Sequence, residues 1–153
     1  MYKQILVAVD GSPTGERAVN EAAKIAKATG AAVTALYVVQ HPARLVDVGS
    51  NFAEEQLHAE SESGIATAAL EQAKAVFARE GVVGSTRAAD AIGEEIASAI
   101  YRIAAESDAD LVVMGTQGRT GVKRLFLGSV AESYLRVADR PVMLVRLEEL
   151  AGT

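Results

Sequence analysis

The sequence predicts a single doubly wound α/β domain, with a five-stranded parallel sheet and helices on both faces. Short apolar runs alternate with longer segments of helical periodicity, and such alternation implies right-handed crossovers between parallel strands. The apolar runs are continuous, as in strands that are covered on both faces. The 153 residues are enough for one core and too few for two.

The first elements are predicted from local signals. Residues 5–9 form a continuous apolar run and are expected to be the first strand. Ser12 suits an N-cap and Pro13 the first position of a helix, which should run to about residue 29, where Gly30 ends it. Residues 32–39 are the second predicted strand.

The middle of the chain is expected to hold a long helix, a strand and a further helix. The long helix covers about 53–80, and the third strand covers 82–89. Asp90 is expected to cap the next helix, because isoleucines then recur close to the helical period, at Ile92, Ile96, Ile100 and Ile103. The segment 44–52 gives mixed signals, and a flap over a ligand is one hypothesis for it.

Two strands and a glycine-rich loop complete the pattern. The fourth strand is predicted at 111–114 and is followed by a loop with glycines at 115, 118, 121 and 128. A short helix at about 129–138 and a fifth strand at 142–146 follow. We therefore expect one domain over 1–147 and a short tail over 148–153.

Composition argues against several classes of protein. The formal net charge is −5 and the longest basic cluster is Lys123-Arg124, which disfavours nucleic-acid binding. The chain has no cysteine, so it has no disulfide framework, and a reducing compartment such as the cytoplasm is expected. No apolar stretch approaches the roughly 20 residues needed to span a bilayer, so membrane insertion is not expected.

The position of a site follows from the topology. In open α/β sheets, ligands bind beyond the carboxyl ends of the strands, where the winding reverses. If the chain winds through strands two and three and then returns, strands one and four become neighbours. Asp10 follows strand one and the stretch 115–121 follows strand four, so these two loops are expected to form the site.

The glycine-rich loop has the features of a phosphate site. Glycines let successive backbone N–H groups point at an anion, and Gly128-Ser129 opens a helix whose N-terminus favours negative charge. Arg119 could add positive charge. The alternative is that these glycines only make turns and Ser129 only caps the helix. Asp10 likewise could accept from a ribose hydroxyl, help hold a metal, or simply start the helix.

The chain resembles the universal stress protein family, in its ATP-binding branch. That branch is marked by Gly-x2-Gly-x9-Gly-Ser/Thr, which reads here as Gly115, Gly118 and Gly128-Ser129. Residues 5–12 and 140–145 also resemble the family's first and last strands, so the resemblance covers essentially the whole chain. It implies a Rossmann-like sheet in the order 3-2-1-4-5, ATP with or without Mg²⁺ as ligand, and a homodimer through strand 142–146.

The resemblance also implies roles for individual residues. Asp10 would bind the ribose or lie near the phosphates, and Gln117 departs from the histidine or arginine of many relatives. Those expected around the base and sugar are Ala8, Val38 through its backbone, Met114 and Gly115. Those expected around the phosphates are Gly118, Arg119, Gly128, Ser129 and Val130.

An efficient catalyst is not expected. No Gly-Lys-Ser/Thr closes the loop, no second acid stands beside Asp10, and His41 and His58 lie outside the motif. The prediction is a nucleotide-binding regulator with slow ATP hydrolysis at most. Two alternatives stay open: a dimeric interaction module of the same fold that binds no nucleotide, and a receiver-like signalling domain, which would need a phosphoacceptor aspartate after strand three.

Overall fold

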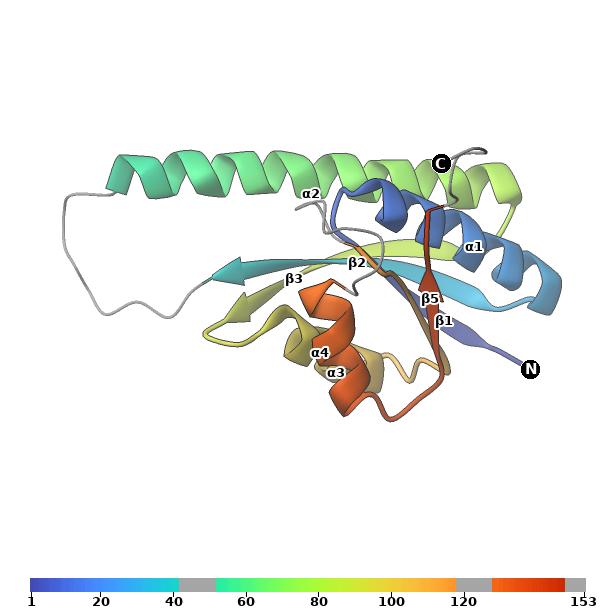
Figure 1. Ribbon diagram of the computed structural model, residues 1–153. Helices are drawn as coiled ribbons and strands as arrows, with labels where there is room; N and C mark the ends of the chain where they lie inside the picture. The colour runs from blue at the N-terminus through green and yellow to red at the C-terminus, as the bar shows by residue number, and fades with distance from the viewer. Residues whose placement is uncertain (42–51, 118–127, 148–153) are drawn as a thin grey trace, which may run out of the picture.

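The computed structural model describes residues 1–41, 52–117 and 128–147, with the backbone alone for 52–60. Strands and helices alternate along these ranges (Figure 1), and the sheet order is β3-β2-β1-β4-β5 with every neighbouring pair parallel. This confirms the predicted doubly wound fold. The elements are β1 Gln4–Val9, α1 Pro13–Thr29, β2 Ala32–His41, α2 Phe52–Glu80, β3 Gly84–Ile92, α3 Ile96–Glu106, β4 Leu111–Gly115, α4 Ser129–Val137 and β5 Val142–Val145.

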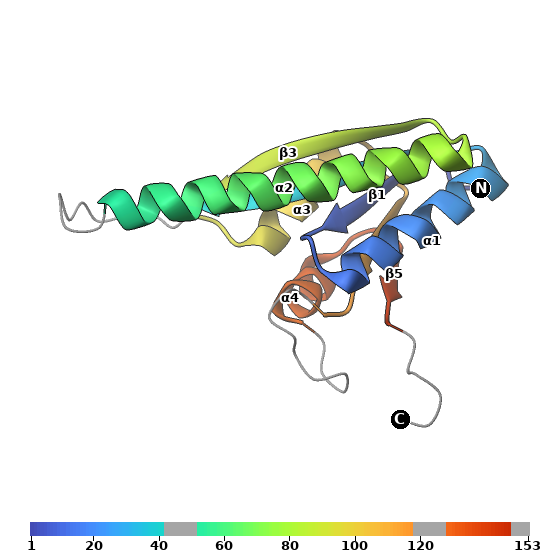
Figure 2. The ribbon, with the colours of Figure 1, turned by 90° about the horizontal axis from the view of Figure 1, so that it is seen from above.

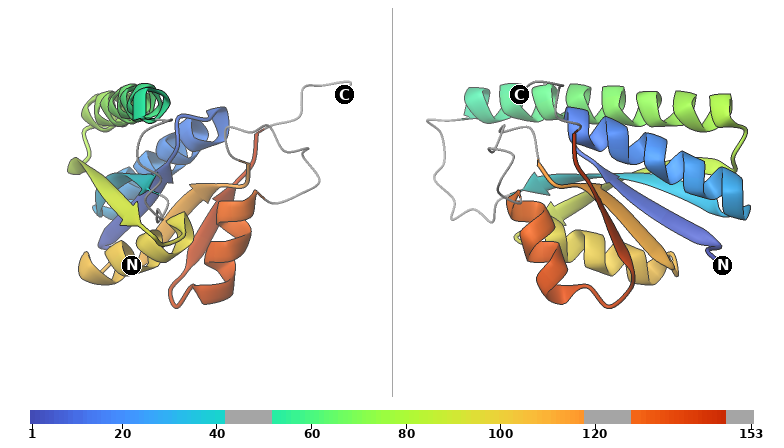
Figure 3. Two further views of the ribbon diagram at one scale, coloured as in Figure 1. Left: turned by 90° about the vertical axis from the view of Figure 1, so that its left-hand side faces the viewer. Right: turned by 45° about the vertical axis from the view of Figure 1, so that its right-hand side comes forward.

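The helices cover both faces of the sheet, with α1 and α2 on one face and α3 and α4 on the other (Figures 2 and 3). Alternate residues of a strand face opposite sides. Ile5 and Val7 therefore pack with the alanines of α1, while Leu6 packs with Ile100 and Ile103 of α3. Because both faces are buried, β1 reads as a continuous apolar run.

Helix α1 begins and ends where the sequence predicts. The Oγ of Ser12 accepts a hydrogen bond from the N–H of Gly15 at 3.1 Å, and Pro13 occupies the first turn. Gly30 adopts φ 78° and its N–H donates to the carbonyl of Ala26 at 2.8 Å. Glycine suits this position because L side chains rarely adopt such a positive φ.

Two predictions were wrong, and both concern β3 and the helix that follows it. β3 runs to Ile92, so Asp90 lies in a strand and does not cap a helix. Its carboxylate lies 2.7 Å from Nε2 of His41 instead. Helix α3 starts only at Ile96, and Ile92 is 76% exposed. β3 pairs with β2 alone among the described strands, and its mostly exposed side chains lack the apolar pattern of a central strand.

At its carboxyl end, β2 extends beyond β1, its neighbour on one side. The last residue pair between β1 and β2 is Val9 with Tyr37, whereas β2 stays paired with β3 as far as His41. From residue 38 to 41, the edge of β2 that faces away from β3 therefore has no strand partner in the described part of the chain. This free edge lies at the carboxyl end of the sheet. None of the helices in the described ranges has the length and apolarity to cross a bilayer.

Candidate functional site

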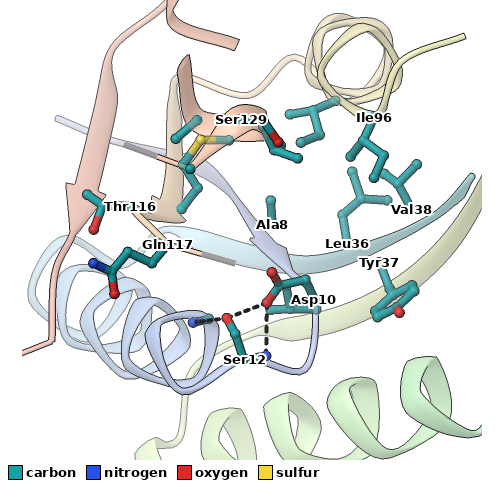
Figure 4. A pocket seen from close by; sticks show the side chains of 18 of the residues that line it. Ala8, Asp10, Ser12, Leu36, Tyr37, Val38, Ile96, Thr116, Gln117 and Ser129 are labelled. Atoms are coloured by element: carbon teal, nitrogen blue, oxygen red, sulfur yellow. Dashed lines mark hydrogen bonds between the residues drawn. The ribbon is translucent and has the colours of Figure 1, made fainter. Parts of the chain in front are cut away.

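A pocket opens at the switch point, between the carboxyl ends of β1 and β4, where the sequence places the site (Figure 4). Its volume is about 220 Å³. This lies below the roughly 300–1,000 Å³ typical of small-molecule sites, so the cavity suits part or all of one small ligand. Gly118 and Arg119 lie outside the described residues. The remaining predicted site residues all line the pocket: Ala8, Asp10, Val38, Met114, Gly115, Gly128, Ser129 and Val130.

One end of the pocket is apolar. Figure 4 shows Leu36, Val38 and Ile96 gathered there, and Ile100 and Met114 also line the cavity. These side chains come from β2, β4 and the start of α3, and they belong to the core between the sheet and α3 and α4. They carry no hydrogen-bonding groups for a ligand apart from the weak thioether acceptor of Met114. Directional recognition at this end would therefore fall to backbone groups, and Val38, the first residue of the free edge of β2, lines the pocket.

Asp10 is held in place by the first turn of α1. The N–H and the hydroxyl of Ser12 both donate to its Oδ1, at 2.9 and 2.5 Å. Oδ2 accepts no hydrogen bond from the described residues. Asp10 thus both supports the helix start and offers one carboxylate oxygen as an acceptor in the pocket. The two interpretations of this residue, helix start and ligand contact, are compatible.

Gly115 has a packing role beyond any contact with a ligand. A Cβ placed on it would lie 2.6 Å from Oγ1 and 2.7 Å from Cβ of Thr14 in α1. Thr14 is 2% exposed, and its hydroxyl donates to the carbonyl of Gln117. Only glycine lets the first turn of α1 approach the end of β4 this closely. The contact fixes the start of the loop that follows β4.

The N-terminus of α4 is left without a side-chain cap. Gly128, and not Ser129, is the N-cap residue, and as a glycine it has no side chain that could accept a hydrogen bond from the first-turn amides. This corrects the interpretation of Ser129 as the cap. The N–H of Gly128 donates to the carbonyl of Thr116, so the loop's two ends meet. The first N–H groups of a helix have no partner within it and carry partial positive charge, so α4 offers the pocket an anion site.

Several lining residues were not predicted as ligand contacts, and two of them, Tyr37 and Glu62, carry polar side-chain groups that bond to each other. Tyr37 comes from β2 and Glu62 from α2, and the Tyr37 hydroxyl donates to Oε1 of Glu62 at 2.6 Å. Among the described lining residues, the charged ones are Asp10 and Glu62, and both are acidic. Three basic residues of the glycine-rich loop, Arg119, Lys123 and Arg124, lie outside the described residues. In residues 1–41, 61–117 and 128–147, no cluster of three or more His, Cys, Asp or Glu side chains is placed to hold a metal ion.

Comparison with known proteins gives consistent matches over nearly the whole chain. A model described as the universal stress protein family matches residues 1–146. A universal stress protein of Methanocaldococcus jannaschii is 36% identical over 149 residues, covering 95% of this chain and 83% of the relative.

Solved structures match as well. The universal stress protein UspA from Lactobacillus plantarum gives a TM-score of 0.81 at 27% identity, covering 95% of this chain and 98% of that one. A universal stress protein from Archaeoglobus fulgidus, solved in complex with dAMP, gives a TM-score of 0.63 at 28% identity, covering 94% of this chain and 98% of that one.

Proposed function

The chain belongs to the universal stress protein family, and from that premise we propose that it is a regulator that binds an adenine nucleotide, ATP above all, in the pocket between β1 and β4. One observation carries the proposal. A single cavity combines an apolar end, a carboxylate oxygen without a described partner and an uncapped helix N-terminus. These three features match a base, a ribose and a phosphate in that order.

The proposed pose follows from the position of each feature. The base lies between Val38 and Met114 and bonds to the backbone at the free edge of β2. A ribose hydroxyl donates to Oδ2 of Asp10. The phosphates lie at the N-terminus of α4, beside Ser129 and Val130, where Gly118 and Arg119 of the motif would complete the site. The dAMP complex of the Archaeoglobus fulgidus relative supports an adenine nucleotide as the class of ligand.

We propose slow hydrolysis at most. A good phosphoryl-transfer site positions a base and clamps the phosphates with metal ions. Of the described lining residues, Asp10 is engaged by Ser12, and Glu62 is engaged by the hydroxyl of Tyr37, which packs on the opposite face of the sheet from the apolar end. Mg²⁺ that enters with ATP would be held mainly by phosphate oxygens and water, with Asp10 as the candidate protein ligand. Binding would then act by favouring one conformation or assembly over another.

The direct test is to identify and titrate the ligand. The purified protein is denatured, any released nucleotide is identified by mass spectrometry, and the emptied protein is titrated with Mg-ATP by calorimetry. Gly118→Leu is expected to abolish binding. The matched control is Gly64→Leu, because a Cβ at Gly64 meets nothing within 4 Å. No released nucleotide and no heat of binding would refute the proposal and favour the module that binds no nucleotide.

We also propose a homodimer through β5. This strand is the last in the described sheet, Met143 on it is 36% exposed, and residues 143–147 form a shallow groove with Arg17 and Glu21 of α1. An apolar edge strand needs a partner or a cover. Light scattering should give twice the monomer mass, and Met143→Glu should give a monomer. Val83→Glu, at an exposed position just before β3 on the opposite edge, should leave the dimer intact.

A further inference from the structure

Ala8 differs from the rest of the apolar run 5–9 in β1, because it alone in that run is half-buried instead of buried. It faces α3 and α4 and lines the pocket. We propose that Ala8 is a specificity-determining residue: its short side chain leaves the space that a purine base fills, so the site prefers purine to pyrimidine nucleotides. This inference rests on the proposed nucleotide binding and adds the residue that sets the preference for the base.

Ala8 lies in the middle of a row of side chains that crosses the sheet. In the register of β1 with β2, Ala8 is opposite Leu36. The register of β1 with β4 pairs Val7 with Val113, and continuing it by one residue places Met114 on the other side of Ala8. Leu36 and Met114 are large and buried. The row is therefore large, small, large, and the floor of the pocket is lowest over Ala8, which Figure 4 shows among the other labelled side chains.

Two residues earlier on the same face of β1, the space is filled. Leu6 is 1% exposed and packs with Ile100 and Ile103 of α3. Over Ala8, by contrast, Ile96 and Ile100 line a cavity. Protein cores are close-packed, and parallel strands covered on both faces are rich in valine, isoleucine and leucine. An alanine at this position therefore leaves a space that the packing of the fold does not require.

This space is where the proposed pose places the base. Val38 on β2 and Met114 on β4 lie on opposite sides of β1, so a base that contacts both has to cross Ala8. One methylene group more or less in an apolar pocket changes the affinity of a ligand by roughly 10- to 200-fold. A purine is larger than a pyrimidine and covers more of the floor. A larger side chain at position 8 therefore weakens purine nucleotides more than pyrimidine nucleotides.

The test changes the size of residue 8 and the size of the base. Dissociation constants for Mg-ATP and Mg-CTP are measured by calorimetry in the wild type, Ala8→Val and Ala8→Leu. The two nucleotides share the ribose and the triphosphate, so a difference between them comes from the base. Urea midpoints of unfolding are measured without ligand. The matched control is Ala88→Val, the same exchange at an exposed position of β3 that does not line the pocket.

The wild type is expected to bind ATP more tightly than CTP. Ala8→Val should weaken ATP binding roughly 10-fold or more and CTP binding less, so that the preference for ATP falls, and Ala8→Leu should abolish measurable ATP binding. The urea midpoint of Ala8→Val should rise, because the added carbon atoms fill part of the cavity. A variant that gains stability while it loses its preference for the purine has lost the space for the base and not the fold. Ala88→Val should leave the preference unchanged.

Three outcomes would overturn the inference, and one of them also ends the proposed function. An unchanged preference in Ala8→Val, with both nucleotides still bound, shows that residue 8 does not select the base. A lower urea midpoint with equal weakening of both nucleotides shows that the exchange distorts the domain as a whole. If the wild type binds neither nucleotide, the proposed function fails and the inference fails with it.

Discussion

Replacing Gly115 with alanine tests whether the approach of α1 to the end of β4 requires a residue without a side chain. The new Cβ would lie 2.6 Å from Oγ1, 2.7 Å from Cβ and 3.0 Å from the backbone carbonyl carbon of Thr14. Thr14 cannot simply turn away, because it is 2% exposed and its hydroxyl bonds to the carbonyl of Gln117. The helix start or the strand end has to move.

The expected cost follows from two contributions. Overpacking a tight core costs about 1–3 kcal/mol, and loss of the Thr14 hydrogen bond adds about 1 kcal/mol. We expect Gly115→Ala to lower the free energy of unfolding by about 2–4 kcal/mol. For a chain of this size that corresponds to a fall in Tm of roughly 5–15 °C. The assay is urea and thermal unfolding followed by far-UV circular dichroism, since the chain has no tryptophan.

Two controls make the reasoning refutable. Gly64→Ala places the same methyl group where nothing lies within 4 Å, inside α2, and should stabilise the protein by about 0.5–1 kcal/mol through helix propensity. Thr14→Ala removes the oxygen at 2.6 Å, so Gly115→Ala should cost about 1 kcal/mol less in that background. An unchanged urea midpoint for Gly115→Ala would refute the steric argument, and an equal loss in both backgrounds would show that Oγ1 of Thr14 is not the atom that resists the new Cβ.

Three further predictions concern single side chains. Asp10→Ala removes the acceptor for both Ser12 donors, so it should cost about 1–2 kcal/mol in stability and reduce the preference for ATP over dATP, measured by urea unfolding and calorimetry. Tyr134→Phe removes a buried hydroxyl without a partner in the described residues and should stabilise by about 1 kcal/mol. Burial raises the pKa of Tyr134 in the folded state above its usual 10.0. The free energy of unfolding of the wild type is therefore unaffected by this group below that pH and falls as the pH rises through the folded-state value, because the unfolded state loses the proton first. Urea midpoints across this alkaline range should therefore fall less in Tyr134→Phe, and an equal fall would contradict the assignment. Arg140→Lys should cost about 1–2 kcal/mol in urea unfolding, because one guanidinium nitrogen donates to the carbonyls of both Ala104 and Ala109, at 3.1 and 2.8 Å, and a wild-type midpoint would argue against this role.

The sequence predicts elements well where the signal is local. Ser12, Pro13 and Gly30 define α1 to the residue, because capping depends on near neighbours. β3 was misplaced, because an edge strand with mostly exposed side chains has no apolar pattern to read. Asp90 satisfies the local criteria for a cap, yet its actual partner, His41, lies on the neighbouring strand.

The same distinction applies to the site. The loops after β1 and β4 could be predicted, because strand ends and topology determine where they meet. Glu62 could not, because nothing within a long helix marks the one turn that reaches over the carboxyl end of β2. Only one of the two roles of Gly115 could be predicted from the sequence. Its place in the motif indicates a phosphate loop, whereas the contact with Thr14 depends on the packing of α1 against β4.

The junction of β1 and β4 has a mechanical consequence for the whole domain. The N–H groups of Lys3 and Gln4 donate to the carboxylate of Asp110, across 107 and 106 residues of chain, and the strand pair they begin joins the first half of the protein to the second. The pocket straddles this junction, with β1 and β2 on one side and β4 and α4 on the other. A ligand that contacts both sides would link the two half-sheets. At a concentration one hundred times its Kd it would stabilise the folded state by about 2.7 kcal/mol, so the backbone amides along the junction would open and exchange more slowly when the pocket is occupied.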